Sequence, residues 1–170
     1  MTVKIAILGD THIRNFKDLP RDMTKEIEDS DWVIHVGDYI SLDVLEGLIK
    51  LKGDRFKGVY GNADPKSIRN RVKSKEIIEI LGKKIGITHP ASGGSSEIIE
   101  TQVLEEFNNV NVDIIIYGHT HGAKISQEGN TWLINPGKGY LETNYFGPPT
   151  TLVILKVDEK IRGDIKEINS

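Results

Sequence analysis

Short apolar runs that end in a glycine and a polar residue recur along this chain. The first three span residues 3–8, 32–36 and 56–60, and they are closed by Gly9-Asp10, Gly37-Asp38 and Gly61-Asn62. A continuous apolar run of this length, bounded by turn residues, is typical of a strand buried on both faces. The pattern therefore predicts a sheet whose strands each lead into a polar loop.

Helical patterns separate these strands. Residues 19–30 place apolar side chains at helical spacing, with Pro20 suited to the first turn. Residues 41–51 carry a second apolar stripe behind Ser41, a residue type that caps helices well. The alternation predicts β-α-β units in the first half of the chain.

The second half is richer in strand signals, and Gly82 separates two segments that read as a hairpin. The elements expected there are the hairpin over residues 76–81 and 83–88, a helix over 95–107, and strands over 112–117, 132–135 and 152–157. The sequence contains no internal repeat or linker. We therefore expect one α/β domain over residues 1–170.

The composition is that of a soluble globular protein, with 170 residues of which 38% are hydrophobic and 28% charged. The absence of cysteine excludes disulfides, a thiolate metal site and a cysteine nucleophile. The first residues lack the features of a signal peptide, and no apolar run is long enough to span a membrane. These features predict a cytoplasmic protein without a membrane partner.

The charge pattern bears on the class of partner. The net charge is −3, with lysines and arginines scattered among acidic residues, which is not the pattern of an extended nucleic-acid surface. A bound phosphate ester would therefore need metal ions to balance its charge.

Metal-capable side chains follow five of the predicted strands. They are Asp10 with His12, Asp38, Asn62, His89, and His119 with His121. Ligands in open α/β sheets gather at the carboxyl ends of strands, so we expect these groups to converge on one crevice. A set of nitrogen and oxygen donors suits manganese, iron, zinc, nickel or cobalt better than magnesium or calcium.

Seven ligands are too many for one open catalytic site but fit two ions if one carboxylate bridges them. Asp38 is the natural bridge, because its neighbours in the set fall on either side. Two divalent ions about 3.5–4 Å apart can hold a hydroxide and clamp the oxygens of a phosphoryl group during in-line attack. Because the ligands must be deprotonated, metal affinity should fall as the pH drops through the range in which imidazole is protonated.

The order of these motifs resembles that of a known family. The motifs are Asp10-Thr11-His12, Gly37-Asp38, Gly61-Asn62-Ala63-Asp64, Thr88-His89 and Gly118-His119-Thr120-His121. Together they resemble the calcineurin-like metallophosphoesterases, above all their small single-domain bacterial and archaeal phosphodiesterase branch. The resemblance covers most of the chain, up to Asn135-Pro136-Gly137.

The resemblance implies a four-layer α/β/β/α sandwich of two facing mixed sheets, with the site at one edge. It also implies a first metal ion held by Asp10, His12 and His121, a second held by Asn62, His89 and His119, and Asp38 as the bridge. Asp38, Asn62, His119 and Asp64 are the expected catalytic residues. We expect two divalent ions per chain, manganese before nickel, iron, zinc or cobalt, a small phosphodiester substrate such as a nucleotide, and a homodimer.

Two positions depart from the family pattern. Ala63 stands where the best-known members have a histidine that protonates the leaving group, and such acid help is worth about 10²–10⁴-fold in rate. We therefore expect weak turnover of alkyl phosphomonoesters and better turnover of esters with acidic leaving groups. Pro90 follows His89 where the family usually has glycine, so His89 is expected to approach its metal by a different path.

Other interpretations compete with these. Asp10 and Asp38 can be plain turn residues, and His35, inside a strand, is expected to support the core or the ligands rather than bind metal. Residues 144–150 either line a substrate edge or a subunit contact, or form a plain loop. In function, the alternative is a catalytically weak, metal-binding interaction module that resembles the retromer subunit of this fold. A third option is a metal-regulated protein with incidental activity.

Overall fold

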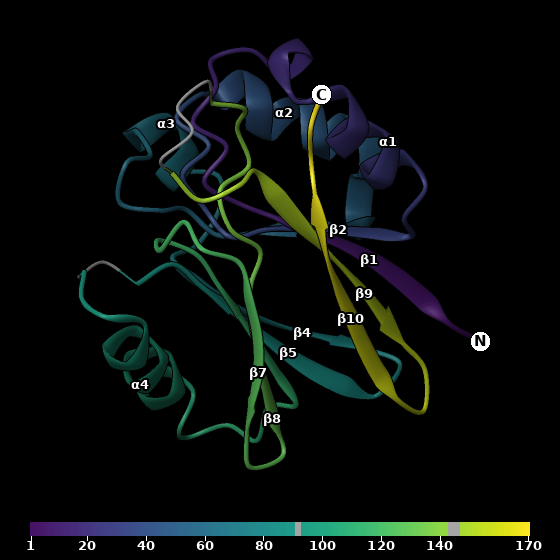
Figure 1. Cartoon of the computed structure of the whole chain (residues 1–170), viewed down its shortest axis with the longest axis vertical. Helices are drawn as coiled ribbons and strands as arrows, with labels where there is room; N and C mark the ends of the chain where they lie inside the picture. The colour runs from purple at the N-terminus through teal and green to yellow at the C-terminus, as the bar shows by residue number, and fades with distance from the viewer. Residues whose placement is uncertain (91–92, 143–146) are drawn as a thin grey trace.

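The computed structural model describes residues 1–90, 93–142 and 147–170, and two five-stranded sheets that face each other form its centre (Figure 1). Within the segment 144–150, residues 144–146 lie outside the described part.

The first sheet has the strand order β10-β9-β1-β2-β3. Its strands are β1 (Val3–Leu8), β2 (Trp32–His35), β3 (Phe56–Gly58), β9 (Thr151–Val157) and β10 (Ile161–Glu167). The strands β1, β2 and β3 are parallel, and Leu8, His35 and Gly58 lie side by side at their carboxyl ends. The loops that follow these strands therefore leave the sheet at the same edge.

The second sheet has the strand order β4-β5-β6-β8-β7. Its strands are β4 (Lys75–Ile80), β5 (Lys83–Thr88), β6 (Ile114–Tyr117), β7 (Lys124–Glu128) and β8 (Thr131–Asn135). Here β5, β6 and β8 are parallel, with Thr88 beside Tyr117, while β4 and β7 run antiparallel to their neighbours. The loops after β5 and β6 therefore also leave together.

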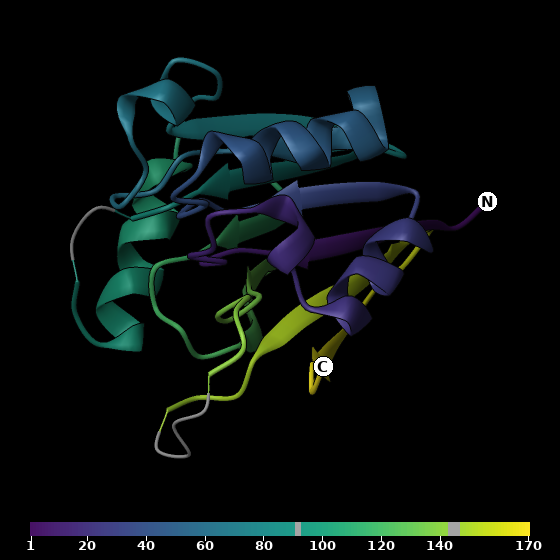
Figure 2. The same cartoon turned by 90° about the horizontal axis from the view of Figure 1, so that it is seen from above.

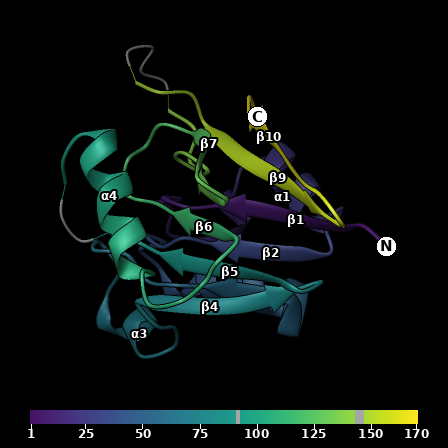
Figure 3. The ribbon, with the colours of Figure 1, turned by 90° about the horizontal axis from the view of Figure 1, so that it is seen from below.

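Helices cover the outer faces of both sheets. The helices are α1 (Arg21–Glu28), α2 (Leu42–Lys52), α3 (Lys66–Arg69) and α4 (Ser96–Glu106), with short 3-10 turns at Phe16–Asp18 and Gly53–Arg55. Seen from above, α1 and α2 lie over the first sheet (Figure 2). Seen from below, α4 lies on the side of the second sheet (Figure 3).

The alternation of side chains along β1 explains the layers. Ile5 and Ile7 point between the sheets, where they pack with residues of the second sheet such as Ile87. Ala6 and Leu8 point the other way and pack under α1 and α2. A strand buried on both faces reads as a continuous apolar run, which is why this pattern was visible in the sequence. The expected four-layer α/β/β/α arrangement of two mixed sheets is confirmed.

The Ser41 cap is confirmed, and the helix ends are shifted slightly from those expected. The Ser41 side chain accepts a hydrogen bond from the Asp43 N–H at 3.2 Å, and that of Ser95 accepts one from the Ile98 N–H at 3.4 Å. The first helix begins later than expected, at Arg21, because Pro20 keeps an extended backbone at the N-cap. The sequence patterns missed β7, β10 and α3.

Candidate metal centre

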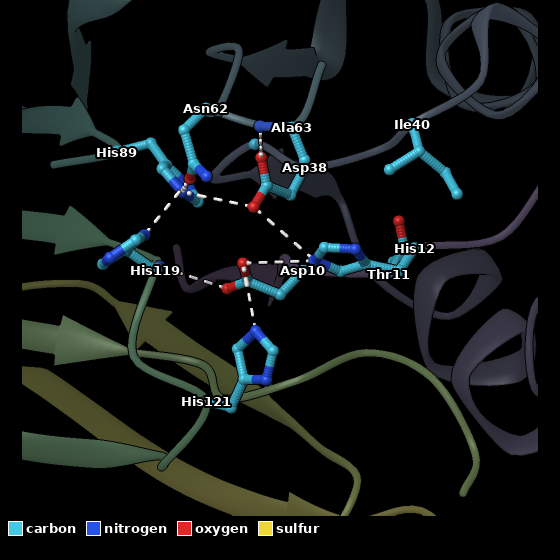
Figure 4. A network of polar contacts seen from close by, with 12 residues as sticks. Asp10, Thr11, His12, Asp38, Ile40, Asn62, Ala63, His89, His119 and His121 are labelled. Carbon is cyan, nitrogen blue, oxygen red and sulfur yellow. Dashed lines mark hydrogen bonds and ion pairs between the residues drawn. The ribbon is translucent and has the colours of Figure 1, made fainter. Parts of the chain in front are cut away.

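All seven predicted ligands lie together at the edge where the parallel strands end (Figure 4). The first sheet supplies Asp10 and His12 after β1, Asp38 after β2 and Asn62 after β3. The second supplies His89 after β5, and His119 and His121 after β6. The site is therefore built from loops of both sheets, and each sheet alone holds only part of it.

One group of ligands is formed by Asp10, His12 and His121. Oδ1 of Asp10 lies 3.8 Å from Nε2 of His12 and 3.7 Å from Nε2 of His121. These atoms are close enough to surround one ion. Both Asp10 Oδ1 and His12 Nε2 are buried without a hydrogen-bond partner, a costly arrangement that a cation would relieve.

A second group gathers around Asp38 and His89, and Asp10 reaches this group as well. Oδ2 of Asp38 lies 3.4 Å from Nε2 of His89. Oδ1 of Asn62 lies 2.9 Å from Nε2 of His89 and 3.2 Å from Nδ1 of His119. His119 thus meets the group through Asn62, while its backbone N–H donates to Asp10 at 3.2 Å.

The chemistry of these atoms tests whether a metal ion fits. Nδ1–H of His89 donates to the carbonyl of Val36 at 2.8 Å, so in the neutral ring Nε2 carries a lone pair. That lone pair faces the Asp38 carboxylate and the Asn62 carbonyl, which are also acceptors. Acceptors that converge without a donor suit a cation, and a ring nitrogen fixed by its other nitrogen is typical of metal-binding histidine. The residues fit the predicted ions.

Proline at position 90 does not move His89 away from the site. The side chain of His89 is fully buried and lies within reach of Asp38 and Asn62. The different path that Pro90 predicts is therefore compatible with the ligand position.

Several ligands occupy backbone conformations that non-glycine residues rarely adopt. Asp10, His12, Asp38 and His119 have φ of 48°, 44°, 62° and 89°. Such residues cost about 1–3 kcal/mol each and tend to gather at functional sites. Close packing also requires glycine at position 61, since a Cβ there would lie 2.1 Å from Oδ1 of Asp38. The loops are shaped to bring the donor atoms together.

The electrostatics of the metal-free site follow from the two carboxylates. Asp10 and Asp38 raise the pKa of His12 from 6.5 to about 9, against the opposing effect of burial. Burial raises the pKa of Asp38, but His12, His89 and the N–H of Ala63 outweigh it and lower that pKa to about 2. At neutral pH the His12 proton therefore supplies positive charge where an ion would lie.

Asp64 faces the backbone of the ligand loops. Its Oδ2 accepts from the N–H groups of Asp38 and Gly61, and its Oδ1 from that of Ile40, all at 2.8 Å. The residue is 3% exposed, and burial raises the pKa of its carboxyl group. Asp64 thus joins the loops that carry Asp38 and Asn62, and its visible contacts are with backbone.

His35 lies behind the ligands, as the sequence predicted. The ring is fully buried, and burial lowers its pKa to about 3, so it is neutral. It contacts Gly37 and Thr11, next to ligands, and stacks on Tyr39 with ring centroids 3.7 Å apart. These contacts agree with a supporting position, and the role itself stays a prediction.

Two features of the site were not predicted. The Tyr140 ring meets the rings of His12 and His121 edge-on, with centroids 5.7 and 6.0 Å away. The Asn135 side chain donates to the carbonyl of Thr120 at 3.0 Å and accepts from the Gly137 N–H at 2.9 Å, which steadies the His121 loop. Asn135-Pro136-Gly137 was a visible signal; nothing in the sequence pointed to Tyr140.

The family can now be assigned. Residues 3–160 match the model of the calcineurin-like phosphoesterase superfamily domain. The chain belongs to this superfamily. The resemblance in the motifs is thereby confirmed. Homologues of this chain include archaeal proteins named as a probable metallophosphoesterase and a phosphodiesterase.

Individual members of the superfamily are similar over nearly their whole length. The phosphodiesterase MJ0936 of Methanocaldococcus jannaschii is 30% identical over 176 residues, covering 93% of this chain and 95% of that protein. A solved structure described as a novel archaeal phosphodiesterase is 26% identical, with a TM-score of 0.64 over 96% of this chain and 99% of the other. Zinc-bound Vps29 of Entamoeba histolytica, at 20% identity, shares the fold with a TM-score of 0.68 over 98% and 99%.

Membership accounts for the chemistry of the donor set, because metallophosphoesterases use divalent metals. Among the described residues, no helix has both the length and the apolar character needed to cross a bilayer.

Proposed function

We propose that this calcineurin-like phosphoesterase is a phosphodiesterase that uses two divalent metal ions, with manganese as the first candidate. One observation carries the proposal: two groups of ligand atoms, both reached by Asp10, converge at one edge, where Oδ1 of Asp10 and Nε2 of His12 are buried without a hydrogen-bond partner. Two ions per chain, held by Asp10, His12 and His121 and by Asn62, His89 and His119, would complete this arrangement. The similarity to proteins named as phosphodiesterases supports the choice of a diester.

Asp38 remains our proposed bridge between the ions. Its Oδ2 lies 3.5 Å from His12 and 3.4 Å from His89, one ligand of each predicted ion. Its Oδ1 is occupied by the Ala63 N–H at 2.8 Å, which fixes the direction of the carboxylate. Asp10, which reaches both groups, is the second shared carboxylate.

The ions, when bound, would neutralise phosphoryl oxygens and lower the pKa of the water that attacks phosphorus. The chain supplies the rest. The carboxylates of Asp10 and Asp38 hold positive charge at the sheet edge, and the Asn62 amide and His119 ring orient the phosphoryl group. The Ala63 methyl group provides no proton, so the leaving group departs as an anion. This favours esters whose leaving group is already acidic, such as p-nitrophenyl esters.

Asp64 takes a positioning role in this proposal. Three backbone N–H groups already occupy its carboxylate, and these belong to the two loops that carry Asp38 and Asn62. The family resemblance places Asp64 among the expected catalytic residues. Its contacts favour an indirect action through the placement of Asp38.

The test is hydrolysis of bis(p-nitrophenyl) phosphate and p-nitrophenyl phosphate by chelator-stripped protein, with manganese, nickel, cobalt, iron, zinc or magnesium restored singly. We expect metal-dependent release from the diester that exceeds release from the monoester. Metal stoichiometry is measured on the same samples, with two ions per chain expected. A larger rate on the monoester would remove the preference for diesters, and binding of no ion would remove the dinuclear site.

A second candidate function is an interaction module with weak catalysis. Two observations favour it. Ala63 stands where the best-known members have the histidine that protonates the leaving group, and the chain shares its fold with Vps29 proteins. Two bound ions per chain with no turnover on either ester would support this function over the first. A homodimer and a cytoplasmic location stay predictions, which sedimentation and cell fractionation would test.

A further inference from the structure

His35 is the one histidine of five that does not belong to the ligand set. It ends β2 and lies beside Leu8, the last residue of β1. The two loops that begin here carry Asp10 with His12 and Asp38. The ring is fully buried between them, out of reach of substrate.

The hydrogen bonds of the ring define one tautomer. The backbone N–H of Gly37 can only donate, and it lies 3.0 Å from Nδ1, so Nδ1 is an acceptor. The proton of the neutral ring is then on Nε2, which donates to Oγ1 of Thr11 at 3.1 Å. One side chain thus holds a group on each of the two loops.

Both contacts lie next to ligands. Thr11 stands between Asp10 and His12, and Gly37 immediately precedes Asp38. The backbones of the same loops also meet directly, since the Asp10 N–H donates to the Gly37 carbonyl at 2.9 Å and the His12 N–H donates to the backbone carbonyl of Asp38 at 3.2 Å. The ring therefore lies where the distance between the two carboxylates is set.

The plane of the His35 ring is itself fixed. Tyr39 stacks on it at an interplanar angle of 14°. The hydroxyl of Tyr39 is buried and has no hydrogen-bond partner, so the tyrosine contributes a flat surface rather than a polar contact. The imidazole cannot rotate away from Thr11 and Gly37 without breaking this stack.

We infer that His35 is a positioning residue that holds the Asp10-Thr11-His12 loop and the Gly37-Asp38 loop in register, so that the two ions bind at a fixed separation. The inference rests on the proposed dinuclear function and adds a residue that touches neither ion nor substrate. Residues that orient metal ligands typically change metal affinity by about 10–100-fold when replaced.

Two substitutions divide the ring into its halves. His35→Asn keeps an acceptor near Nδ1 for Gly37 but does not reach Thr11. His35→Gln reaches Thr11 but leaves the Gly37 N–H without its acceptor. We expect His35→Asn to weaken mainly the ion held by Asp10, His12 and His121, because it frees only the loop of Thr11. His35→Gln frees the loop of Asp38, the proposed bridge, and should weaken both ions.

The measurement is calorimetric titration of chelator-stripped protein with manganese, which resolves two binding events. Single ligand replacements, His121→Asn and His119→Asn, assign each event to its group. The expected result is a loss of about 10–100-fold for His35→Asn at the event of the Asp10, His12 and His121 group, and a loss of similar size for His35→Gln at both events. Loss of both is expected for His35→Phe.

Two controls separate positioning from general destabilisation. Tyr39→Phe removes the unpartnered hydroxyl beside the same ring and should leave both affinities unchanged. Leu48→Ala opens a cavity in the packing under α2, away from the ligand loops, and should lower the unfolding temperature without selective loss of either ion.

The inference is overturned if His35→Asn and His35→Gln bind both ions with wild-type affinity, or if Leu48→Ala, at a similar unfolding temperature, loses as much metal affinity as they do. These two variants decide the matter even if His35→Phe does not fold. Wild-type protein that binds no ion would overturn the proposed function and this inference together. Normal wild-type binding with unchanged His35 variants would overturn this inference alone.

Discussion

Oδ2 of Asp38 lies 3.5 Å from Nε2 of His12, although the two residues follow different strands. The contact brings a carboxylate from the β2 loop against an imidazole from the β1 loop. Because the same oxygen is 3.4 Å from His89, Asp38 stands between ligands from both sheets. Substitution of Asp38 is therefore the strongest single test of whether ligands from both sheets share one metal centre.

Asp38→Asn should weaken both ions and abolish turnover. The amide keeps an acceptor for the Ala63 N–H, so the loop should stay in place while the negative charge is lost. We expect at least a hundredfold loss in kcat, on the order of what removal of one group that stabilises transition-state charge costs. Metal content and kcat measured together check this. Near-normal activity would rule out the bridging assignment.

Ala63→His should raise activity on alkyl phosphate esters. Protonation of a leaving group is worth about 10²–10⁴-fold where it limits the rate, so a gain of about tenfold or more is expected. Activity on bis(p-nitrophenyl) phosphate should change little, because its leaving group is already acidic. Ala63→Gln is the matched control, polar but unable to give a proton at neutral pH. An equal gain in both variants would show that size or polarity, not acid catalysis, is responsible.

Binding of metal should release protons from His12. In the metal-free protein its pKa is about 9, raised from 6.5, so the ring is protonated at pH 7 and must lose that proton to bind an ion. Affinity of this group should therefore rise by up to about tenfold per pH unit from pH 7 to 9 and then level off. Calorimetry in buffers of different ionisation enthalpy should find about one proton released at pH 7 and almost none at pH 10.

The sign is opposite for the metal-free fold. A raised pKa stabilises the folded state fully below pH 6.5, and this contribution is lost as the pH rises through about 9. Unfolding temperatures of stripped protein should therefore fall over the range in which metal affinity increases.

For the calorimetry, a count of zero protons released on metal binding at every pH would contradict the assignment of His12 as the protonated ligand.

Asp64→Asn separates a positioning role from a proton-transfer role. The amide retains one acceptor oxygen for three N–H groups, and unsatisfied buried donors cost about 1–3 kcal/mol of folding stability. We expect lower thermal stability and weaker metal binding, with the shape of the pH–rate profile unchanged. Loss of one limb of that profile at normal metal affinity would instead make Asp64 an acid or base in the reaction.

The predictions from sequence succeeded where local pattern decides structure. The strand that becomes β1 is apolar on both faces because it packs between layers, and Ser41 caps α2 through its own side chain. The ends of parallel strands share an edge, so the position of Asp10 near Asp38 followed from the chain order alone. Here the physics is short-range or set by the topology of the sheet.

The failures have the opposite origin. β10 is an edge strand with many exposed residues, among them Arg162 and Asp164, so its apolar signal is weak. The role of Asp64 depends on three N–H groups from two loops, and Tyr140 meets His12 only through the packing of distant segments. The membership of Asp10 in both ligand groups was also invisible, because it depends on distances of a few ångströms.

The positive φ angles at the ligand positions lower folding stability while they place side chains for metal binding. At residues such as His12 and His119, glycine would fit the backbone with less strain than the imidazole-bearing residue that is present. Replacing His119 by glycine should relieve this strain in the metal-free protein while removing a donor from the centre. Selection for the stability of the metal-free chain alone would therefore not preserve a ligand such as His119.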